Sequence, residues 1–200
     1  AVYLGLDGFN ARRGAANFSE EEFKKAVRYC HIRGAKVYVT LNTLVGDREL
    51  SEAAGLARMA SDYGADGIII QDMGMIRVIR EALPDIPLHA STQMTVTSLE
   101  GVRYLEDMGF SRVVLARELS LEEIKRIRQN IPETVELECF VHGAMCISYS
   151  GRCLLSDYLD GRSSNRGACV QSCRWEYEIR EKSKGGEFLT IEEDDRGTYI

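Results

Sequence analysis

The sequence predicts an α/β fold with a parallel sheet, in which strands and helices alternate along residues 1–143. Two observations support this. Short apolar runs such as residues 67–70 alternate with amphipathic segments, and strands of parallel sheets read as continuous apolar runs because helices cover them. The amphipathic segments also carry recognisable helix-start residues.

Six strands and five helices are expected in alternation. The predicted strands span residues 2–6, 36–40, 67–70, 88–94, 112–116 and 135–141. The helices lie between them, and the second to the fourth are expected at 47–63, 75–83 and 98–108. Every strand is expected to be buried on both faces except where polar residues interrupt it.

Serine residues mark the starts of the first and the fifth helix. Ser19 precedes a helical apolar pattern and Glu22 follows it by three residues, which is the capping-box pattern. Ser120 and Glu123 repeat this pattern at the fifth helix. The spacing predicts that the inner face of the fifth helix carries Leu121, Ile124 and Ile127.

Every predicted strand ends in polar residues. A barrel of the TIM type brings all its strand ends to one mouth, where such enzymes keep their sites, whereas a doubly wound sheet uses mainly the ends beside its switch point. The pattern therefore favours a partial TIM-like (β/α) barrel, although each residue alone also fits an ordinary strand cap. The strand-end residues are Asp7, Asn42, Asp72, Gln93, Arg117, Glu118 and His142.

The length is short for a complete barrel, which needs eight strands and roughly 250 residues. The chain has 200 residues and about six predicted strands, so we expect an internal piece of a longer protein. Residues 1–143 would form the barrel units, 144–180 a cysteine-rich cluster-binding segment of the same domain, and 181–200 an acidic connector.

Composition narrows the class of protein. The net charge of −6 argues against a general nucleic-acid coat, while leaving room for a local basic site. No run approaches the ~20 apolar residues of a membrane helix, and no leader peptide is visible, so a cytoplasmic protein without a membrane segment is expected. Cys30 and Cys139 lie in helix and strand patterns and are expected as small buried apolar residues.

The other four cysteines follow the last predicted strand. Cys146, Cys153, Cys169 and Cys173 have the spacing C-x6-C-x15-C-x3-C. Iron–sulfur clusters are usually held by four cysteine thiolates, whereas structural zinc prefers pairs of cysteines two to four residues apart. Only the last two resemble such a pair, so the spacing favours a cluster. Zinc, reactive thiols and plain core cysteines remain open.

A histidine near the first of these cysteines suggests a different chemistry. His142 precedes Cys146 by four residues, and a Cys–His pair can act as nucleophile and base in peptide hydrolysis. A hydrogen bond from His142 to nearby backbone would account for the histidine without any catalytic role. Neither HExxH nor GxSxG occurs in the chain, which removes two common hydrolase motifs.

Arginines in the same segment suggest an anionic ligand. Arg162, Asn165 and Arg166 lie in the loop GRSSNRG, and guanidinium groups bind phosphates or carboxylates with paired hydrogen bonds. Arg174 and Trp175 place a cation beside an aromatic face that could stack on a base. A solvated turn and a buried tryptophan fit the same composition.

Several segments together carry a family resemblance. They are ECFVHGAMC at 138–146, SGRCLLS at 150–156, HASTQ at 89–93, VLARELSLEEI at 114–124, NRGAC at 165–169, SCRWEY at 172–177 and GTYI at 197–200. Over essentially all of its length the sequence resembles peptidase family U32, the collagenase-like proteins. Within that family it is most similar to the branch that forms 5-hydroxyuridine at the wobble position of bacterial tRNA.

The resemblance implies a TIM-like barrel with a 4Fe–4S cluster on Cys146, Cys153 and Cys169. The fourth family cysteine is expected beyond Ile200, and Cys173 could replace it. For the RNA-modifying branches the resemblance also implies prephenate as oxygen donor. The expected catalytic residues are His142, Arg117 and Glu118, and the expected substrate-binding residues are Asp72, His89, Gln93, Arg162, Asn165, Arg166 and Arg174.

The function expected from the resemblance is therefore prephenate-dependent hydroxylation of tRNA, by an enzyme that binds tRNA or another RNA. One alternative is a collagenase-like peptidase with Cys146 as nucleophile and His142 as base. Hydroxylation of a ribosomal RNA cytidine is a second alternative. A non-catalytic, cluster-bearing protein partner, as in ubiquinone synthesis, is a third.

Overall fold

The computed structural model of the protein describes residues 1–12, 14–143, 145–180, 185, 188–189, 192–194 and 197–199. The chain divides into two compact units, Ala1–Val170 and Gln171–Ile200, which we describe separately. The first unit contains the predicted barrel and three of the four clustered cysteines. Cys173 belongs to the second unit.

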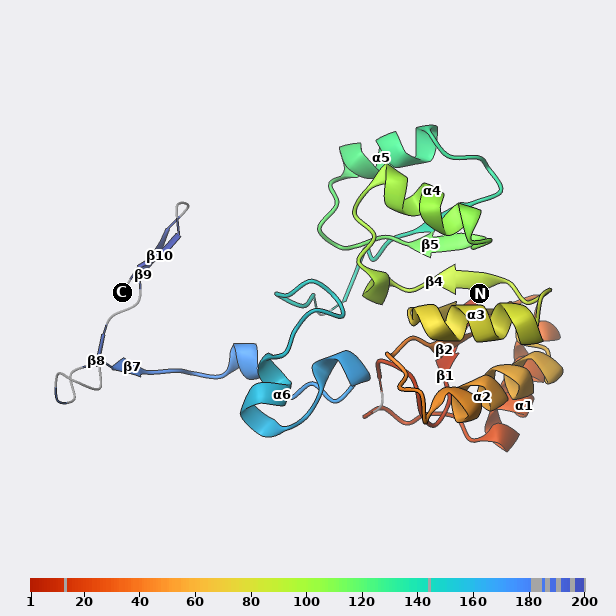
Figure 1. Ribbon diagram of the computed structural model, residues 1–200, viewed down its shortest axis with the longest axis horizontal. Helices are drawn as coiled ribbons and strands as arrows, with labels where there is room; N and C mark the ends of the chain where they lie inside the picture. Colours follow the sequence, from red (N-terminus) through yellow and green to blue (C-terminus); the bar gives the residue numbers. More distant parts are fainter. Residues whose placement is uncertain are drawn as a thin grey trace. The chain divides into compact units, whose positions relative to one another are not determined.

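Strands and helices alternate through the first unit, as the sequence predicts (Figure 1). The strands are β1 (Val2–Gly5), β2 (Val37–Leu41), β3 (Gly67–Ile70), β4 (Leu88–Ala90), β5 (Arg112–Val114) and β6 (Glu136–Glu138). The helices between them are α1 (Glu20–His31), α2 (Leu50–Asp62), α3 (Met73–Ala82), α4 (Leu99–Asp107) and α5 (Leu121–Gln129). A short 3-10 helix, η1 (Thr92–Met94), follows β4.

The six strands form one parallel sheet in the order β1-β2-β3-β4-β5-β6. Each strand pairs with the next one in the chain, so the order never reverses as it does in a doubly wound sheet. Residues from all five helices join one buried core with alternate strand residues such as Val39, Ile68 and Leu88. All five helices therefore cover the same sheet face, which confirms the partial TIM-like barrel.

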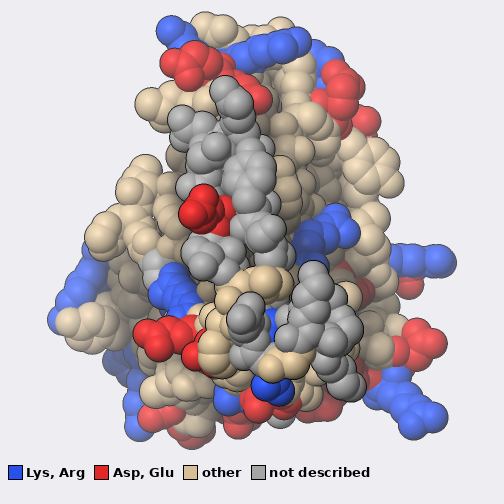
Figure 2. Space-filling model, turned by 90° about the vertical axis from the view of Figure 1, so that its left-hand side faces the viewer, with Lys and Arg blue, Asp and Glu red and all other residues tan. Residues whose placement is uncertain are grey.

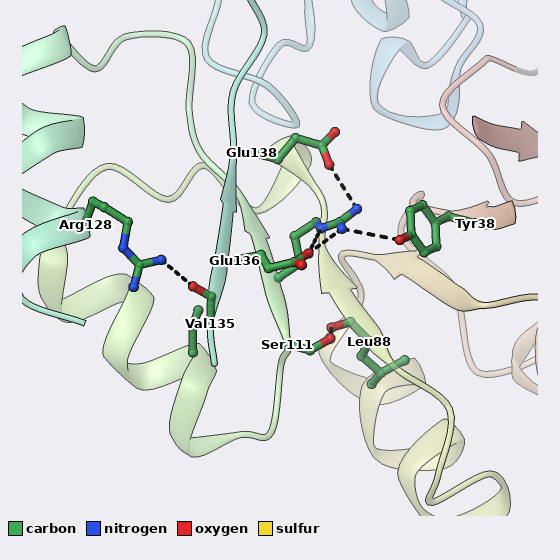
Figure 3. A network of polar contacts seen from close by, with 8 residues as sticks. Tyr38, Leu88, Ser111, Arg128, Val135, Glu136 and Glu138 are labelled. Carbon is green, nitrogen blue, oxygen red and sulfur yellow. Dashed lines mark hydrogen bonds and ion pairs between the residues drawn. The ribbon is translucent and has the colours of Figure 1, made fainter. Parts of the chain in front are cut away.

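The opposite, inner face of the sheet is lined by the remaining strand residues. Register pairs Ile69 with His89, His89 with Arg112, and Arg112 with Glu136, so these four side chains form one row across β3 to β6. Arg112 on β5 donates a hydrogen bond of 3.3 Å to the hydroxyl of Tyr38 on β2, with β3 and β4 between them (Figure 3). This contact ties distant strands together across the inner face.

The predicted helix starts are confirmed. Ser19 and Glu22 form a complete capping box at α1, and Ser120 and Glu123 form another at α5. These contacts satisfy backbone N–H groups that the first turn of a helix leaves without partners. One detail of α5 is wrong, because Leu121 is 79% exposed while Ile127 is buried. As the first residue of the helix, Leu121 precedes the turns that pack on the core.

The outer strands also differ from the prediction of full burial. Val2 and Tyr3 of β1 are exposed, and β6 ends at Glu138, so Cys139 is exposed rather than buried in a strand. Both strands lie at the edges of the six-stranded sheet and have a neighbour on one side only. Cys30 was predicted to be buried, and it is partly buried and packs against the core.

After β6 the first unit continues through α6 (Leu155–Asp160) and η2 (Ser164–Arg166). The second unit contains η3 (Ser172–Arg174) and two short antiparallel pairs. The pairs are β7 (Ile179–Arg180) with β8 (Phe188–Leu189), and β9 (Glu192–Asp194) with β10 (Gly197–Tyr199). The predicted acidic connector, residues 181–200, falls here, and its residues 181–184, 186–187, 190–191, 195–196 and 200 lie outside the described part of the chain. None of the helices among the described residues has the length and apolar character to cross a membrane.

Candidate functional site

A network of polar side chains occupies the C-terminal ends of β2, β3 and β4. Asn42 follows β2, and its amide donates a 3.1 Å hydrogen bond to Oγ of Ser91, which follows β4. Gln71 follows β3 and donates through Nε2 to the backbone oxygen of Asn42 at 2.9 Å. Ser91 and Gln71 are buried, so these contacts satisfy polar groups that would be costly to leave unpaired. These hydrogen bonds therefore connect the polar residues at the ends of β2, β3 and β4.

The cysteine-rich segment crosses these strand ends. We call residues 148–152 the docking turn, which lies between Cys146 and Cys153 and is closed by a hydrogen bond from the Arg152 N–H to the Tyr149 oxygen. Arg117, after β5, donates through Nη2 to the Ser148 backbone oxygen at 3.1 Å and to Ser150 Oγ at 2.7 Å.

Two residues from the β4 end complete the attachment. Thr95 donates through its hydroxyl to the Ser150 backbone oxygen at 2.7 Å. Gly151 packs so closely on η1 that a Cβ atom there would lie 2.7 Å from the Gln93 backbone oxygen and 3.4 Å from Gln71 Oε1. The expected strand-end residues Arg117 and Gln93 thus contact the cysteine-rich segment itself.

The expected ligand-binding residue Asp72 has a structural role. Its Oδ1 accepts a hydrogen bond from the Met75 N–H at 2.9 Å and caps α3. Its Oδ2 accepts from the Val45 N–H at 3.1 Å in the loop after β2. Both carboxylate oxygens thus hold backbone, as an N-cap aspartate typically does.

His89 lies within the sheet rather than at the strand ends. It occupies the middle of β4 on the inner face, is 4% exposed, and packs edge-on against the Tyr38 ring with 4.5 Å between centroids. Gly67 on β3 makes room for it, because a Cβ there would lie 3.3 Å from the imidazole. Burial, helped by the nearby positive charge of Arg112, lowers the pKa of His89 from 6.5 to about 4. The imidazole is therefore neutral at pH 7, and its buried Nδ1 has no hydrogen-bond partner among the described residues.

An ionic group of Arg112, Glu136 and Glu138 was not among the predicted site residues (Figure 3). Arg112 donates through Nε to Glu136 Oε2 at 2.7 Å and through Nη1 to Glu138 Oε2 at 3.4 Å. The hydrogen bond from Arg112 lowers the pKa of Glu136. The sequence held a signal for this group: Glu136 and Glu138 are two positions apart in a predicted strand, so their side chains share one face.

The four clustered cysteines differ in exposure and belong to two units. Cys146 and Cys169 are exposed and Cys153 is partly buried in the first unit, whereas Cys173 is exposed in the second. Among the described residues no three His, Cys, Asp or Glu side chains lie in a group that could hold a metal ion. Thiolates are suitable donors for an iron–sulfur cluster.

Two of the three expected catalytic residues are exposed. His142 and Glu118 both lie on the surface of the first unit. In the part of the chain that the structure describes, no hydrogen bond joins His142 to Cys146. A nucleophile and its base need hydrogen-bond reach, so this geometry does not favour a Cys–His hydrolytic pair.

The glycine-bounded loop at 161–167 is attached at two points. Ser164 donates through Oγ to the Cys153 backbone oxygen at 2.7 Å. Arg166 forms an ion pair with Glu49, the residue before α2. Arg162 is exposed and Asn165 is partly buried. The loop is therefore attached both to the backbone of Cys153 and to the barrel wall at Glu49.

In the second unit Arg174 and its aromatic neighbours form a local group. Arg174 donates through Nη1 to the Gln171 side chain at 3.4 Å. Trp175 stacks on Tyr177 with 6.5 Å between ring centroids, and both rings are about half exposed. An exposed aromatic pair beside an arginine suits stacking on bases.

Comparison with known proteins finds relatives of this chain. The chain is 44% identical over 181 residues to the 23S rRNA 5-hydroxycytidine C2501 synthase of Escherichia coli K12, a match covering 90% of the chain and 27% of that protein. It is 38% identical to tRNA hydroxylation protein P of the same organism, covering all of the chain and 52% of that protein. The chain thus spans about a quarter to a half of these relatives.

A solved structure and a family model agree with these matches. The structure of the U32 peptidase Mk0906 aligns with a TM-score of 0.57 at 22% identity, over 70% of this chain and 59% of that one, which supports the fold. The model of peptidase family U32 matches residues 1–200. With the barrel, the docked cysteine segment and these matches in agreement, the chain belongs to peptidase family U32.

Proposed function

We propose that this chain is the barrel part of an RNA-modifying enzyme that hydroxylates a tRNA uridine to 5-hydroxyuridine. The observation that carries the proposal is the docking turn, which fastens the segment between Cys146 and Cys153 onto the ends of β4 and β5. Barrel enzymes perform their chemistry at these strand ends. The names of two matched relatives, which state hydroxylation of rRNA and of tRNA, supply the reaction class.

We propose tRNA rather than rRNA as the substrate because of how much of each relative the chain matches. The tRNA hydroxylation protein matches over the entire chain, whereas the match to the rRNA synthase covers 90% of the chain and only 27% of that longer protein. The rRNA relative has the higher identity, 44% against 38%, so hydroxylation of a ribosomal cytidine is the second candidate.

We further propose a 4Fe–4S cluster on Cys146, Cys153 and Cys169. The fourth ligand would be Cys173 or a residue beyond Ile200. A bound cluster would supply redox chemistry. The spacing of these cysteines and the suitability of thiolates as cluster ligands support this proposal.

The residues around the cysteines would bind the substrates. Arg162 is exposed and available to a carboxylate of prephenate or an RNA phosphate, and guanidinium groups suit both. Arg174 with Trp175 would contact RNA in the second unit by charge and stacking. On the face drawn in Figure 2, both Lys or Arg and Asp or Glu side chains are seen. The net charge of −6 leaves room for a local basic site, so RNA would be held by local groups such as these.

The test uses the full-length protein in cells that lack their own tRNA uridine hydroxylation. Wild-type protein should restore 5-hydroxyuridine in tRNA, measured by mass spectrometry of nucleosides, and Cys153→Ala should abolish both the modification and the bound iron. Cys30→Ala, remote from the segment, is the matched control and should retain both. Modification that persists in Cys153→Ala contradicts the proposal. 5-Hydroxycytidine appearing in rRNA instead would move the assignment to the second candidate.

Peptidase activity is tested with the same proteins. If purified protein cleaves gelatin and Cys146→Ser abolishes that cleavage while tRNA modification is absent, the chemistry is hydrolytic and the proposal is wrong. Retention of tRNA modification without gelatin cleavage supports hydroxylation.

A further inference from the structure

We propose that Arg117, Thr95 and Gly151 form a latch that positions Cys146 and Cys153 over the strand ends, and that Arg117 is a positioning residue rather than a catalytic one. The proposal deepens the proposed function, on which its relevance to the cluster rests. Its structural content concerns only contacts within the first unit. The latch consists of Arg117, Thr95 and the docking turn, which contains Gly151.

Arg117 uses its fork of N–H groups on the protein rather than on a ligand. Its Nη2 reaches both the Ser148 backbone oxygen and the Ser150 hydroxyl, so it holds two points of the docking turn at once. A guanidinium is suited to this because its donors are planar and fixed relative to one another, unlike those of an ammonium group. The adjacent Nε is buried without a hydrogen-bond partner among the described residues, as expected for a side chain drawn under the turn.

Thr95, the residue after η1, also contacts the docking turn. Its backbone lies in the left-handed region, with φ of 57°, a conformation that is unfavourable for a β-branched residue. Such a conformation persists where neighbouring contacts hold it, and the hydroxyl of Thr95 donates to the Ser150 oxygen at 2.7 Å. Ser150 is thus held through its backbone by Thr95 and through its side chain by Arg117.

Gly151 is required at the closest approach. Its φ of +74° is in the left-handed region, and a Cβ would lie 2.7 Å from the Gln93 backbone oxygen. Backbone at this distance cannot yield as a flexible side chain could, so any other residue must push the turn away from η1. Ser148 lies two residues after Cys146 and Gly151 two before Cys153, so displacing the turn displaces both thiols.

The chain offers a matched control for this position. Gly161, the C-cap of α6, has φ of +64°, but a Cβ there would meet nothing within 4 Å. Gly151→Ala and Gly161→Ala therefore introduce a similar backbone strain, and only the first adds a clash. Any difference between them reports on the contact with Gln93.

The experiment measures release of the turn in the full chain without relying on activity. Trypsin cleavage after Arg152, whose side chain is exposed, and iodoacetamide labelling of Cys153 in iron-free protein are followed over time. Gly151→Ala and Arg117→Lys should accelerate both by about five- to thirtyfold, the range expected when one strong local contact is lost. Gly161→Ala should stay within about twofold of wild type.

A second pair of variants decides the matter if Gly151→Ala fails to fold. Thr95→Val keeps the branched shape and removes the hydroxyl, whereas Thr95→Ser keeps the hydroxyl. The latch requires faster cleavage after Arg152 in Thr95→Val and rates near wild type in Thr95→Ser. Equal rates in the two, or equal rates in the two glycine variants, would overturn it. If full-length wild-type protein binds no iron, the cluster proposal fails, while these rates still decide whether the latch exists.

Discussion

The barrel wall and the cysteine-rich segment after β6 are stabilised in different ways. In the wall, alternate strand residues such as Ile68 and Leu88 are fully buried against the helices. In the segment, Ile147 is 85% exposed and Tyr158 is 86% exposed, and attachment depends on a few hydrogen bonds from strand-end residues. Substitutions in the wall should therefore lower global stability, whereas substitutions in the segment should change local structure and chemistry.

The largest expected effect tests this contrast with one substitution in each region. Leu88→Ala should lower the free energy of unfolding by about 2–5 kcal/mol, because it leaves a cavity in the fully buried core. Leu154→Ala, at a position 67% exposed before α6, should change it by no more than about 0.5 kcal/mol. Urea unfolding followed by circular dichroism measures both. Similar losses in the two variants would remove the distinction between the regions.

The second prediction concerns pH and the inner face of the wall. The folded-state pKa of His89, about 4, lies below its ordinary value of 6.5, so the unfolded chain binds the proton more readily. The contribution to stability is complete above pH 6.5 and is lost as the pH falls toward 4, by up to about 3 kcal/mol. The groups that set this pKa besides burial are Arg112, Glu136 and Lys36.

Comparison of His89→Gln with wild type isolates the contribution of the buried imidazole. Urea midpoints measured from pH 7.5 to 4.5 should fall less steeply in His89→Gln than in wild type. A wild-type slope in His89→Gln would show that the buried imidazole does not carry the pH dependence.

The smallest expected effect on stability concerns the link between the two regions. Glu49→Gln keeps the shape of the side chain and removes the charge that pairs with Arg166. Both partners are partly exposed, so the free energy of unfolding should change by less than about 1 kcal/mol. Amide hydrogen exchange over residues 161–168 should nevertheless become faster, because the loop loses an anchor. Unchanged exchange in this loop would show that Ser164 alone holds it.

Much of the fold could be predicted from local sequence. Ser19 and Ser120 determine where two helices start, because a capping box needs only residues three apart. The edges of the sheet were harder to predict. The apolar runs of the first and last strands look like those of central strands, but their exposure depends on whether a neighbouring strand covers them.

The candidate site was only partly predictable. Arg117 and Gln93 were expected at the strand ends, and they do lie there, but which segment they would contact depends on how the chain returns after β6. Asp72 was expected to bind a ligand and instead caps α3, since an aspartate before a helix serves either role. Asn42 appeared as a strand-end residue, and its bonds to Ser91 and Gln71 could not be foreseen from spacing.

By itself the sequence determined the alternation of strands and helices, the polar strand ends and the presence of four clustered cysteines between residues 146 and 173. Those features depend on residue type and short-range spacing, which are the same before and after the chain folds. Only the tertiary structure decided that His89 is buried beside Arg112. It also decided that Ser150 and Gly151 contact Gln93, Thr95 and Arg117, which follow β4 and β5 in the chain. Such contacts join residues far apart in the chain, and they exist only once the strands have been brought side by side.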